Sequence, residues 1–434
     1  MDKMADVLGR AGAWCGQNKY LSAIKNAFQN FMPLTIAGAI GVLWCNVLVN
    51  ESTGLGIFFK PIMALEFLNP AFQAVNFCTI SCITVGITLG IAQEIGVWNM
   101  GAEKAGYIPG LVGLAAWLSV TNTSHMVEGA KEAFTGIAGN ELGATGLFTG
   151  MIIGVLSVEL FCFFEKQDAL KIKMPEQVPP GVARAFEVLV PATITLIITA
   201  CIGSACYNLT GLYLNDVIKN GIQGPLGAVG ATIPGVMIIY LVIMLFWLVG
   251  IHGNNMLSAV KEALFTPLAL ENVEAFNKGE TPKNIINMYA LQMWGEFGGS
   301  GVTIGLVIAI MIFGKREDNK AIATLSLVPG LFNINETVTF GVPMVLNPIL
   351  GIPFVVAPLV TIIIGYVLTV IGFCPVACLT VPWTTPPIVF GFLACGANVM
   401  GAVTQAILIV VSTVIYVPFL ISYEKYQNKQ AAEA

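Results

Sequence analysis

One short polar segment, set between two apolar runs of membrane length, carries the residue types best suited to chemistry. It reads Phe332-Asn333-Ile334-Asn335-Glu336-Thr337, so a carboxylate follows two amides. A glutamate in hydrocarbon is energetically costly unless it faces protein, water or a ligand. Glu336 is therefore predicted to belong to a functional site. The alternative is a carboxylate that caps a helix or pairs with a structural arginine, but no Arg or Lys lies within a helical turn of it.

Helix breakers surround this segment on both sides. Pro329-Gly330 precedes it, Gly341 and Pro343 follow it, and Asn347-Pro348 comes shortly afterwards. Irregular backbone at membrane depth is tolerated only against protein or a water-filled cavity, and transporters build binding sites from such broken segments. The pattern predicts a broken or re-entrant segment with its tip inside the protein.

A histidine is the second candidate for chemistry. His252 ends a long apolar run and is followed by Gly253-Asn254-Asn255, which indicates a helix end beside a polar cavity. An imidazole and a carboxylate could together bind a hydroxyl and assist removal of its proton. Taken by itself, an isolated histidine of this kind is more often a capping or packing residue. The other histidine, His125, lies in a polar loop without an evident partner, and we assign it no role.

Two tryptophans could supply the apolar wall of a binding pocket. Trp247 lies just before His252, and Trp383 lies in the segment Pro382-Trp383-Thr384-Thr385-Pro386-Pro387. Pockets combine apolar walls with a few polar groups, whereas a tryptophan at the end of a span is usually an interfacial residue. The sequence does not decide between these alternatives for Trp247. For Trp383, which lies between prolines, it favours a pocket wall.

A glycine-rich stretch, Gly298-Gly299-Ser300-Gly301, precedes another apolar run. It lacks the Gly-Lys-Ser/Thr ending of a phosphate loop, and no predicted strand precedes it, so a nucleotide site is not expected. The pattern instead favours small residues that let helices, or the backbone and a ligand, approach closely. Glu296 immediately precedes the stretch, and the sequence does not decide whether it enters the site.

Composition places the chain in a membrane. Hydrophobic residues make up 56% and charged residues 10% of its 434 residues, and the formal net charge is −5. This profile is far from that of a soluble domain, and no basic stripe with interleaved aromatics indicates a nucleic-acid partner. Most of the ten cysteines lie in apolar runs, where cysteine behaves as a small hydrophobe. We therefore expect neither a metal site nor a cofactor.

The apolar windows predict an all-α polytopic membrane protein. They lie at 31–49, 72–93, 107–121, 145–164, 186–206, 229–251, 298–314, 353–371 and 398–421. Positive-inside placement of the Lys/Arg groups requires a further crossing within 252–297, unless the loop at 315–320 lies outside. We expect about ten transmembrane helices, with re-entrant hairpins in the C-terminal half, where the segments 252–297, 315–352 and 372–397 are too polar to span simply.

A proline-rich segment, from Met174 to Phe186, divides the chain into two halves. Residues 1–30 are predicted to be a retained amphipathic or cytoplasmic segment, because they lack the apolar core and cleavage site of a signal peptide. Residues 31–185 are predicted to form an N-terminal membrane subdomain. Residues 186–434 are predicted to form a C-terminal membrane subdomain with the substrate site and the re-entrant hairpins.

Several motifs, in order from about residue 20 to residue 420, closely resemble the lactose/cellobiose/diacetylchitobiose-type family of sugar-translocating C components of the bacterial phosphotransferase system. The Asn-Ile-Asn-Glu block is the most specific of them. The resembling segments are Pro329-Gly330-Leu331-Phe332-Asn333-Ile334-Asn335-Glu336, Phe340-Gly341-Val342-Pro343, Asn347-Pro348, Met174 to Phe186, Gly250-Ile251-His252-Gly253, Gly298-Gly299-Ser300-Gly301 and Pro382-Trp383-Thr384-Thr385-Pro386-Pro387.

The resemblance implies roles for these residues. Glu336 would bind the primary hydroxyl of the sugar and lie nearest to phosphoryl transfer, and His252 would contact the sugar beside it. Asn333 and Asn335 would be hydrogen-bond donors or braces of the hairpin. The other expected substrate-binding residues are Trp247, Trp383, Thr384, Gly299 and Ser300.

The resemblance also implies partners and a location. The protein would be a homodimer in the bacterial inner membrane, with the N-terminal subdomain as the expected dimerisation part. It would import a β-linked disaccharide and present it to a separate phosphorylated B component, itself supplied by an A component. No phosphocysteine loop of a B domain is evident in this chain. The chain by itself would therefore bind and move sugar without modifying it, and which disaccharide it prefers stays open.

A proton-coupled secondary sugar transporter is the alternative. In that case Glu336 or Glu159 would relay the proton that drives symport. A membrane-embedded enzyme is a weaker candidate, because no metal-ligand cluster or nucleophile–base pair is visible in the sequence.

Overall fold

A computed structural model describes residues 17–51, 59–125, 134–175, 177–342 and 344–433, together with residues 10, 14 and 56. Pro343, one of the predicted helix breakers, lies outside the described residues. The described chain is almost entirely helical, and its only strands are β1 (Ser124–His125) and β2 (Phe134–Thr135), which pair antiparallel. The predicted all-α fold is confirmed.

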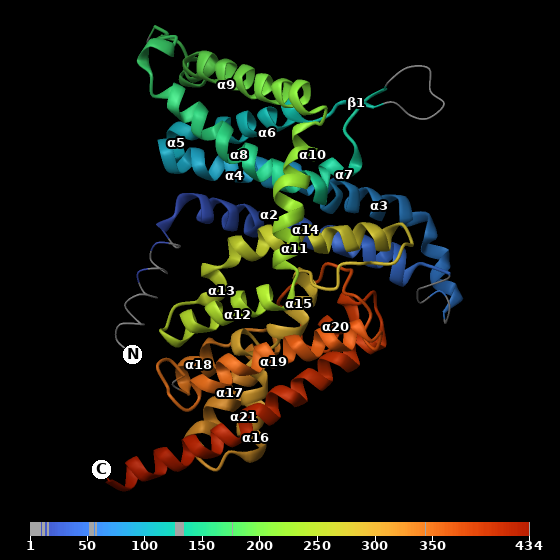
Figure 1. The fold of residues 1–434 in the computed structure, drawn as a ribbon, viewed down its shortest axis with the longest axis vertical. Helices are drawn as coiled ribbons and strands as arrows, with labels where there is room; N and C mark the ends of the chain where they lie inside the picture. The colour runs from blue at the N-terminus through green and yellow to red at the C-terminus, as the bar shows by residue number, and fades with distance from the viewer. Residues whose placement is uncertain are drawn as a thin grey trace. The chain divides into compact units, whose positions relative to one another are not determined.

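Contacts divide the chain into two compact units (Figure 1). Unit 1 holds residues 1–16, 39–73 and 228–434, and unit 2 holds residues 17–38 and 74–227. Residue 186, the predicted subdomain boundary, lies inside helix α9 (Pro180–Thr210) of unit 2. The site described below belongs to unit 1.

Unit 2 is built around helices α4, α6, α8 and α9, which pack against one another. Its core includes the buried side chains of Ala116, Trp117, Val120 and Ile153. Helices α2 and α3 each lie partly in unit 2 and partly in unit 1. The bounds of the elements of unit 2 are α2 (Lys19–Leu43), α3 (Asn69–Cys78), η4 (Ile80–Cys82), α4 (Ile83–Met100), α5 (Ala102–Ala105), α6 (Ile108–Val120), α7 (Gly139–Leu142), α8 (Ala144–Glu165), η5 (Asp168–Leu170), α9, α10 (Leu214–Ile218) and η6 (Lys219–Gln223).

Local sequence explains the ends of α9. Pro180 stands in its first turn, where the missing N–H costs nothing, and Gly211 ends it in the left-handed conformation that glycine adopts without strain. In the hairpin, one sequence expectation was wrong: His125 has a partner. Its Nε2 lies 3.2 Å from the carbonyl of Asn122, a contact made by the tight local turn.

Unit 1 is held together chiefly by α21, which packs against α16 and α19, and by the packing of α12 on α19 and α17 on α16. The bounds of its elements, including α11, which begins in unit 2, are η1 (Trp44–Leu48), η3 (Lys60–Leu68), α11 (Gly224–Gly230), α12 (Ile233–Leu248), α13 (Gly253–Met256), α14 (Ser258–Asn277), α15 (Met288–Gly295), η7 (Ser300–Val302), α16 (Ile304–Phe313), α17 (Glu317–Leu331), α18 (Glu336–Gly341), α19 (Gly351–Val370), α20 (Val389–Ala394) and α21 (Val399–Glu433).

Each of the nine apolar windows corresponds to helix in the structure. Among the described residues, six helices are long and apolar enough to cross a membrane, or seven if the bent pair Met288–Val302 and Ile304–Phe313 counts as one span. That pair bends by 59°, and α6 and α12 are shorter apolar helices. The extra crossing within 252–297 stays a prediction, because α14 carries Lys and Glu residues along its length.

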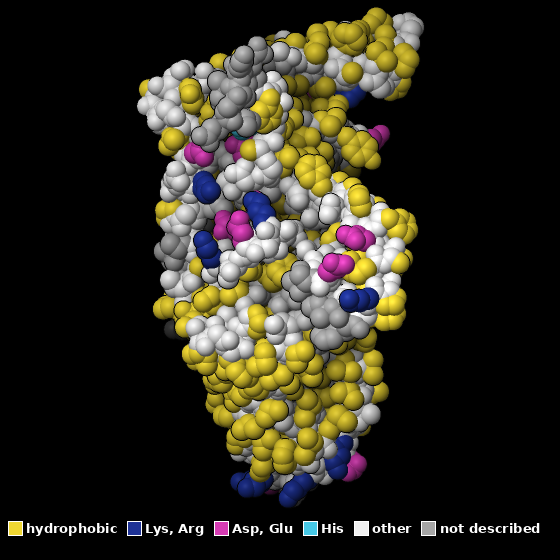
Figure 2. All heavy atoms as spheres, turned by 90° about the vertical axis from the view of Figure 1, so that its right-hand side faces the viewer, with side chains coloured by type: hydrophobic (Ala, Val, Ile, Leu, Met, Phe, Trp, Pro, Cys, Tyr) yellow, Lys and Arg dark blue, Asp and Glu magenta, His cyan; other side chains and the backbone are white. Residues whose placement is uncertain are grey.

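The surface agrees with a multi-pass membrane protein. Figure 2 shows hydrophobic side chains covering the part of unit 1 that holds α16, α17, α19 and α21, with Lys and Arg gathered at the tip below. The exposed side chains on these helices include Ile312, Leu325, Ile363 and Val410. Such an apolar surface is stable in contact with lipid, whereas in water it would promote aggregation.

Candidate functional site

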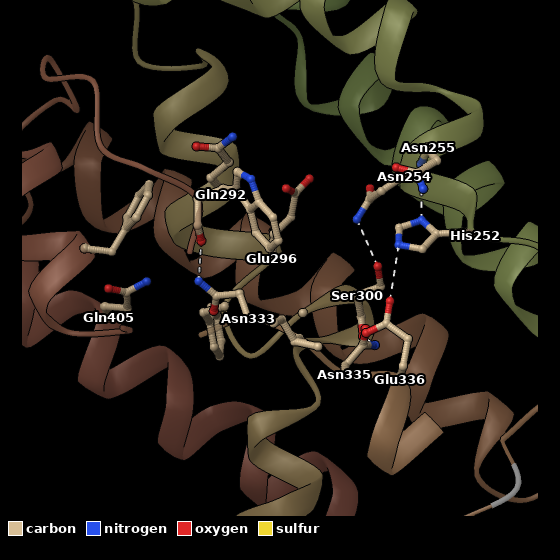
Figure 3. Close-up of a pocket in the computed structure, with 15 residues that line it drawn as sticks. His252, Asn254, Asn255, Gln292, Glu296, Ser300, Asn333, Asn335, Glu336 and Gln405 are labelled. Carbon is tan, nitrogen blue, oxygen red and sulfur yellow. Dashed lines mark hydrogen bonds and ion pairs between the residues drawn. The ribbon is translucent and has the colours of Figure 1, made fainter. Parts of the chain in front are cut away.

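Most of the predicted site residues gather around one cavity of about 410 Å³ in unit 1 (Figure 3). This volume lies within the range of small-molecule pockets, roughly 300–1,000 Å³. The cavity combines amides, carboxylates and an imidazole with aromatic and aliphatic side chains. Its lining residues are His252, Asn254, Asn255, Gln292, Glu296, Phe297, Gly299, Ser300, Asn333, Ile334, Asn335, Glu336, Trp383, Phe390 and Gln405.

The polar segment singled out in the sequence forms the turn between two helices. Helix α17 ends at Leu331 and α18 begins at Glu336, so Asn333 and Asn335 lie in the connection. Pro329 stands in the last turn of α17, and Asn333 has a positive φ of 63°, a conformation that asparagine tolerates better than most residues. The local sequence therefore ends the first helix at the cavity and aims the next one away from it.

The glycine-rich stretch also lines the cavity, and its backbone lies close to this turn. Gly299 has a φ of 87°, and a Cβ built on it would lie 2.7 Å from Cβ of Asn335. Only glycine fits such a position without strain. The Asn335 amide then donates a 2.8 Å hydrogen bond to the carbonyl of Ser300, which joins the two segments.

Asn333 joins three segments at once. Its Oδ1 accepts a 2.6 Å hydrogen bond from the backbone N–H of Gly298, and its Nδ2 donates to the carbonyls of Trp383 and Thr385. These bonds use both amide N–H groups, so the side chain has little capacity left for a ligand. Of the two roles considered for Asn333, the geometry favours the brace.

Glu336 and His252 face each other across the cavity. His252 Nε2 lies 3.8 Å from Glu336 Oε1, too far for a direct hydrogen bond. The ring's other nitrogen, Nδ1, accepts the backbone N–H of Asn255 at 3.3 Å, so His252 caps α13. A neutral imidazole that accepts at Nδ1 carries its proton on Nε2. His252 therefore presents a donor, and Glu336 an acceptor, to the same space.

The charge state of His252 follows from its surroundings. Burial lowers the pKa of His252, with the charge of Glu336 acting in the opposite direction, so the neutral ring is favoured at pH 7. Glu336 keeps 47% of its side chain exposed. Because His252 Nε2 and Glu336 Oε1 lie 3.8 Å apart, a hydroxyl oxygen can lie at hydrogen-bond distance, about 2.8 Å, from both of them. The arrangement can hold a hydroxyl by donating to its oxygen and accepting its proton.

Two predicted substrate-binding residues, Trp247 and Thr384, do not line this cavity. Trp247 is 2% exposed and lies behind His252, with ring centroids 4.5 Å apart. The ring of Phe354 also lies edge-on to Trp247, with ring centroids 6.4 Å apart. Trp247 therefore positions the imidazole, whereas Trp383, with 43% exposure, contributes a lining ring.

Sequence reasoning missed several lining residues, and Gln405 is the most instructive. It lies in the middle of the apolar helix α21 and is only 1% exposed. Its Oε1 accepts from the backbone N–H groups of Ile388 and Gly391, and its Nε2 donates to the carbonyl of Met293. An amide within a membrane-length apolar run was the available signal, because such a group must find partners. The other missed residues are Asn254, Asn255, Gln292, Phe297, Ile334 and Phe390, whereas Glu296, which the sequence left undecided, does line the cavity.

Comparisons with known proteins agree with this picture. Residues 25–358 match the family model described as phosphotransferase system, EIIC. The chain is 33% identical to the oligo-beta-mannoside-specific EIIC component of Bacillus subtilis (strain 168), over 98% of this chain and 94% of the relative. It is 30% identical to the cellobiose-specific EIIC component of Lactococcus lactis subsp. lactis (strain IL1403), over 98% of both chains.

A solved structure matches as well. It is the crystal structure of the transporter ChbC, the IIC component from the N,N'-diacetylchitobiose-specific phosphotransferase system. Its TM-score is 0.88 at 30% sequence identity, and the alignment covers 97% of each chain.

Proposed function

Because this chain belongs to the phosphotransferase system EIIC family, we propose that it imports a β-linked disaccharide and presents the sugar's primary hydroxyl to a separate phosphorylated B component. The facing pair of His252 and Glu336 is the observation that carries this proposal. It supplies one donor and one acceptor for a single hydroxyl in a cavity of suitable size.

The chemistry expected at this pair is the activation of the hydroxyl for phosphoryl transfer. The Nε2–H of His252 donates to the hydroxyl oxygen, and the carboxylate of Glu336 accepts its proton. The oxygen then forms a bond to phosphorus while the bond from phosphorus to the B component's cysteine sulfur breaks, and the thiolate leaves. Positioning supplies most of the effect, because such a transfer requires little covalent chemistry from the protein.

The substrate class is inferred from the relatives and the cavity. The relatives named above act on oligo-β-mannosides, cellobiose and N,N'-diacetylchitobiose, all of them β-linked. The mixture of an exposed tryptophan with amides and carboxylates suits a pyranose, which has apolar faces and polar edges. The homodimer, and the role of residues 31–185 in forming it, are part of this proposal and rest on the family resemblance.

We expect a β-linked disaccharide to stabilise the purified protein more than any monosaccharide does. A bound ligand raises the free energy of unfolding according to its occupancy, so a thermal-shift screen ranks affinities. The screen would compare cellobiose, mannobiose, lactose and N,N'-diacetylchitobiose with their component sugars. A preference for a free hexose, or for a non-sugar such as ascorbate, would contradict the proposed substrate class.

A transport assay in vesicles distinguishes the proposal from proton-coupled symport. Vesicles that contain the protein should accumulate sugar phosphate, and only when the phosphorylated B component is present. Accumulation of free sugar driven by a pH gradient would instead favour the secondary transporter.

Trp383 provides a test of the pocket wall. Trp383→Ala should weaken disaccharide binding by about 1–3 kcal/mol through lost apolar contact, and Trp383→Phe should recover part of the loss. Calorimetric titration in detergent measures both. Trp98→Ala in α4 is a matched control, because Trp98 is exposed and does not line the cavity. Unchanged affinity in both Trp383 variants would remove Trp383 from the site.

A further inference from the structure

A second carboxylate in the cavity has no role in the chemistry proposed above. Glu296 follows α15 and lines the cavity, with 17% of its side chain exposed. Its Oε1 accepts a 2.7 Å hydrogen bond from the hydroxyl of Tyr240, which is fully buried, and it also pairs with Nζ of Lys261. Lys261 is itself only 7% exposed.

Both contacts are made by Oε1 of Glu296, so the other carboxylate oxygen, Oε2, is left to consider. Among the described residues, no hydrogen bond engages Oε2, although the side chain borders the cavity. The carboxylate is therefore held in place from behind. Its remaining capacity is that of an acceptor, since an ionised carboxylate has no proton to donate.

Gln292 adds a second acceptor to the same wall. It lies four residues before Glu296, and the backbone N–H of Glu296 donates to the carbonyl of Gln292 at 3.3 Å, which keeps the two residues close together. Figure 3 shows Gln292 and Glu296 on the same side of the cavity. The Oε1 of Gln292 is buried without a hydrogen-bond partner, as is the Oδ1 of Asn254. A buried polar atom without a partner is costly, so a ligand that supplies donors there gains affinity.

We propose that Glu296, positioned by Lys261 and Tyr240, selects sugars that bear free hydroxyls over sugars that bear N-acetyl groups. The inference rests on the proposed function, because it concerns the sugar in the same cavity. Glu296 and Gln292 form an acceptor subsite, and Lys261 is a positioning residue that does not itself contact the sugar.

The selectivity follows from hydrogen-bond capacity. A hydroxyl donates to the carboxylate and fits a small space. The N–H of an acetamido group could also donate to the carboxylate, but the group carries in addition a methyl and a carbonyl oxygen, which need more space and, for the carbonyl, a donor that Glu296 lacks. A buried acceptor left facing an acceptor discriminates strongly against the wrong ligand. Glutamine at position 296 would keep the shape and add an N–H that could bind this carbonyl.

The test compares cellobiose with N,N'-diacetylchitobiose, which differ at the acetamido positions. Calorimetric affinities would be measured for the wild-type protein and for Glu296→Gln. We expect the wild type to prefer cellobiose, and the variant to lose about tenfold in cellobiose affinity while its affinity for N,N'-diacetylchitobiose holds or rises. The ratio of the two affinities is the decisive quantity, since a general loss of folding lowers both alike.

Glu262→Gln is the matched control. Glu262 is the neighbour of Lys261 on α14, does not line the cavity, and accepts a hydrogen bond from Thr266 that glutamine can also accept. Its variant should keep the wild-type ratio. A wild-type preference for N,N'-diacetylchitobiose, or an unchanged ratio in Glu296→Gln, would overturn the inference and leave the proposed function standing.

Two further variants separate specificity from folding. Lys261→Met leaves the largely buried carboxylate of Glu296 without its cation and should lower the melting temperature. Lys261→Met combined with Glu296→Gln should recover much of that melting temperature. The double variant should still show the altered sugar ratio. A recovered melting temperature together with the wild-type ratio would assign the pair a purely structural role. Wild-type protein that binds none of cellobiose, mannobiose, lactose and N,N'-diacetylchitobiose would overturn the proposed function, and this inference with it.

Discussion

Glu336→Gln is expected to lower uptake with phosphorylation by about a hundredfold or more, while the protein folds normally. The amide keeps the shape of the side chain but loses the charge that orients the hydroxyl and accepts its proton. A positioned general base contributes about 10²–10⁴-fold to such reactions. The fold should tolerate the change because the side chain is half exposed and, among the described residues, its one ion-pair contact is the 3.8 Å approach to His252.

The measurement is sugar phosphate formed in vesicles that hold equal amounts of protein, with the phosphorylated B component supplied. Glu280→Gln is the matched control, because Glu280 is exposed and does not line the cavity. Full activity of Glu336→Gln at wild-type protein levels would remove Glu336 from the mechanism.

His252→Ala is expected to impair phosphorylation more than equilibrium sugar binding. The imidazole donates to one hydroxyl among several, so the ligand keeps most of its contacts when the ring is removed. The reacting oxygen, however, loses the group that orients it towards Glu336. Rates of phosphorylation and calorimetric affinities, measured on the same preparation, give the two effects separately.

The alanine variant also removes the cap of α13, so a second variant is needed. His252→Asn keeps an acceptor for the N–H of Asn255, since asparagine is a good N-cap, but it has no imidazole. His125→Ala, in the hairpin of unit 2, controls for loss of a histidine away from the cavity. Equal loss of binding and phosphorylation in His252→Asn would make His252 a simple ligand.

Local signals in the sequence predicted the helical membrane fold and the polar turn that lines the candidate site. Long apolar runs determine spans because the hydrocarbon core has a set thickness and requires each segment to satisfy its own backbone. Glu336 stood out for the same reason, as a charge where charge is costly. Prolines and glycines marked the ends of the helices that position Glu336. Both signals, the misplaced charge and the helix breakers, depend only on residues close together in the sequence.

Tertiary structure decided which side chains meet. Asn333 became a brace because its amide reaches Gly298 and the carbonyl of Thr385, which are distant in sequence. Trp247 lies behind His252 instead of lining the cavity, since the turn after α12 folds the imidazole back over the indole.

Glu296, the second carboxylate in the cavity, likewise shows what local sequence signals could not predict. Its pairing with Lys261 and Tyr240 joins three helical segments, and no local pattern encodes such a meeting. Hydropathy and helix breakers depend on a few consecutive residues, so the chain alone determined the spans and the polar turn. Hydrogen-bond partners depend on how helices pack, so only the folded molecule determined which of the polar residues face the cavity and which hold it in shape.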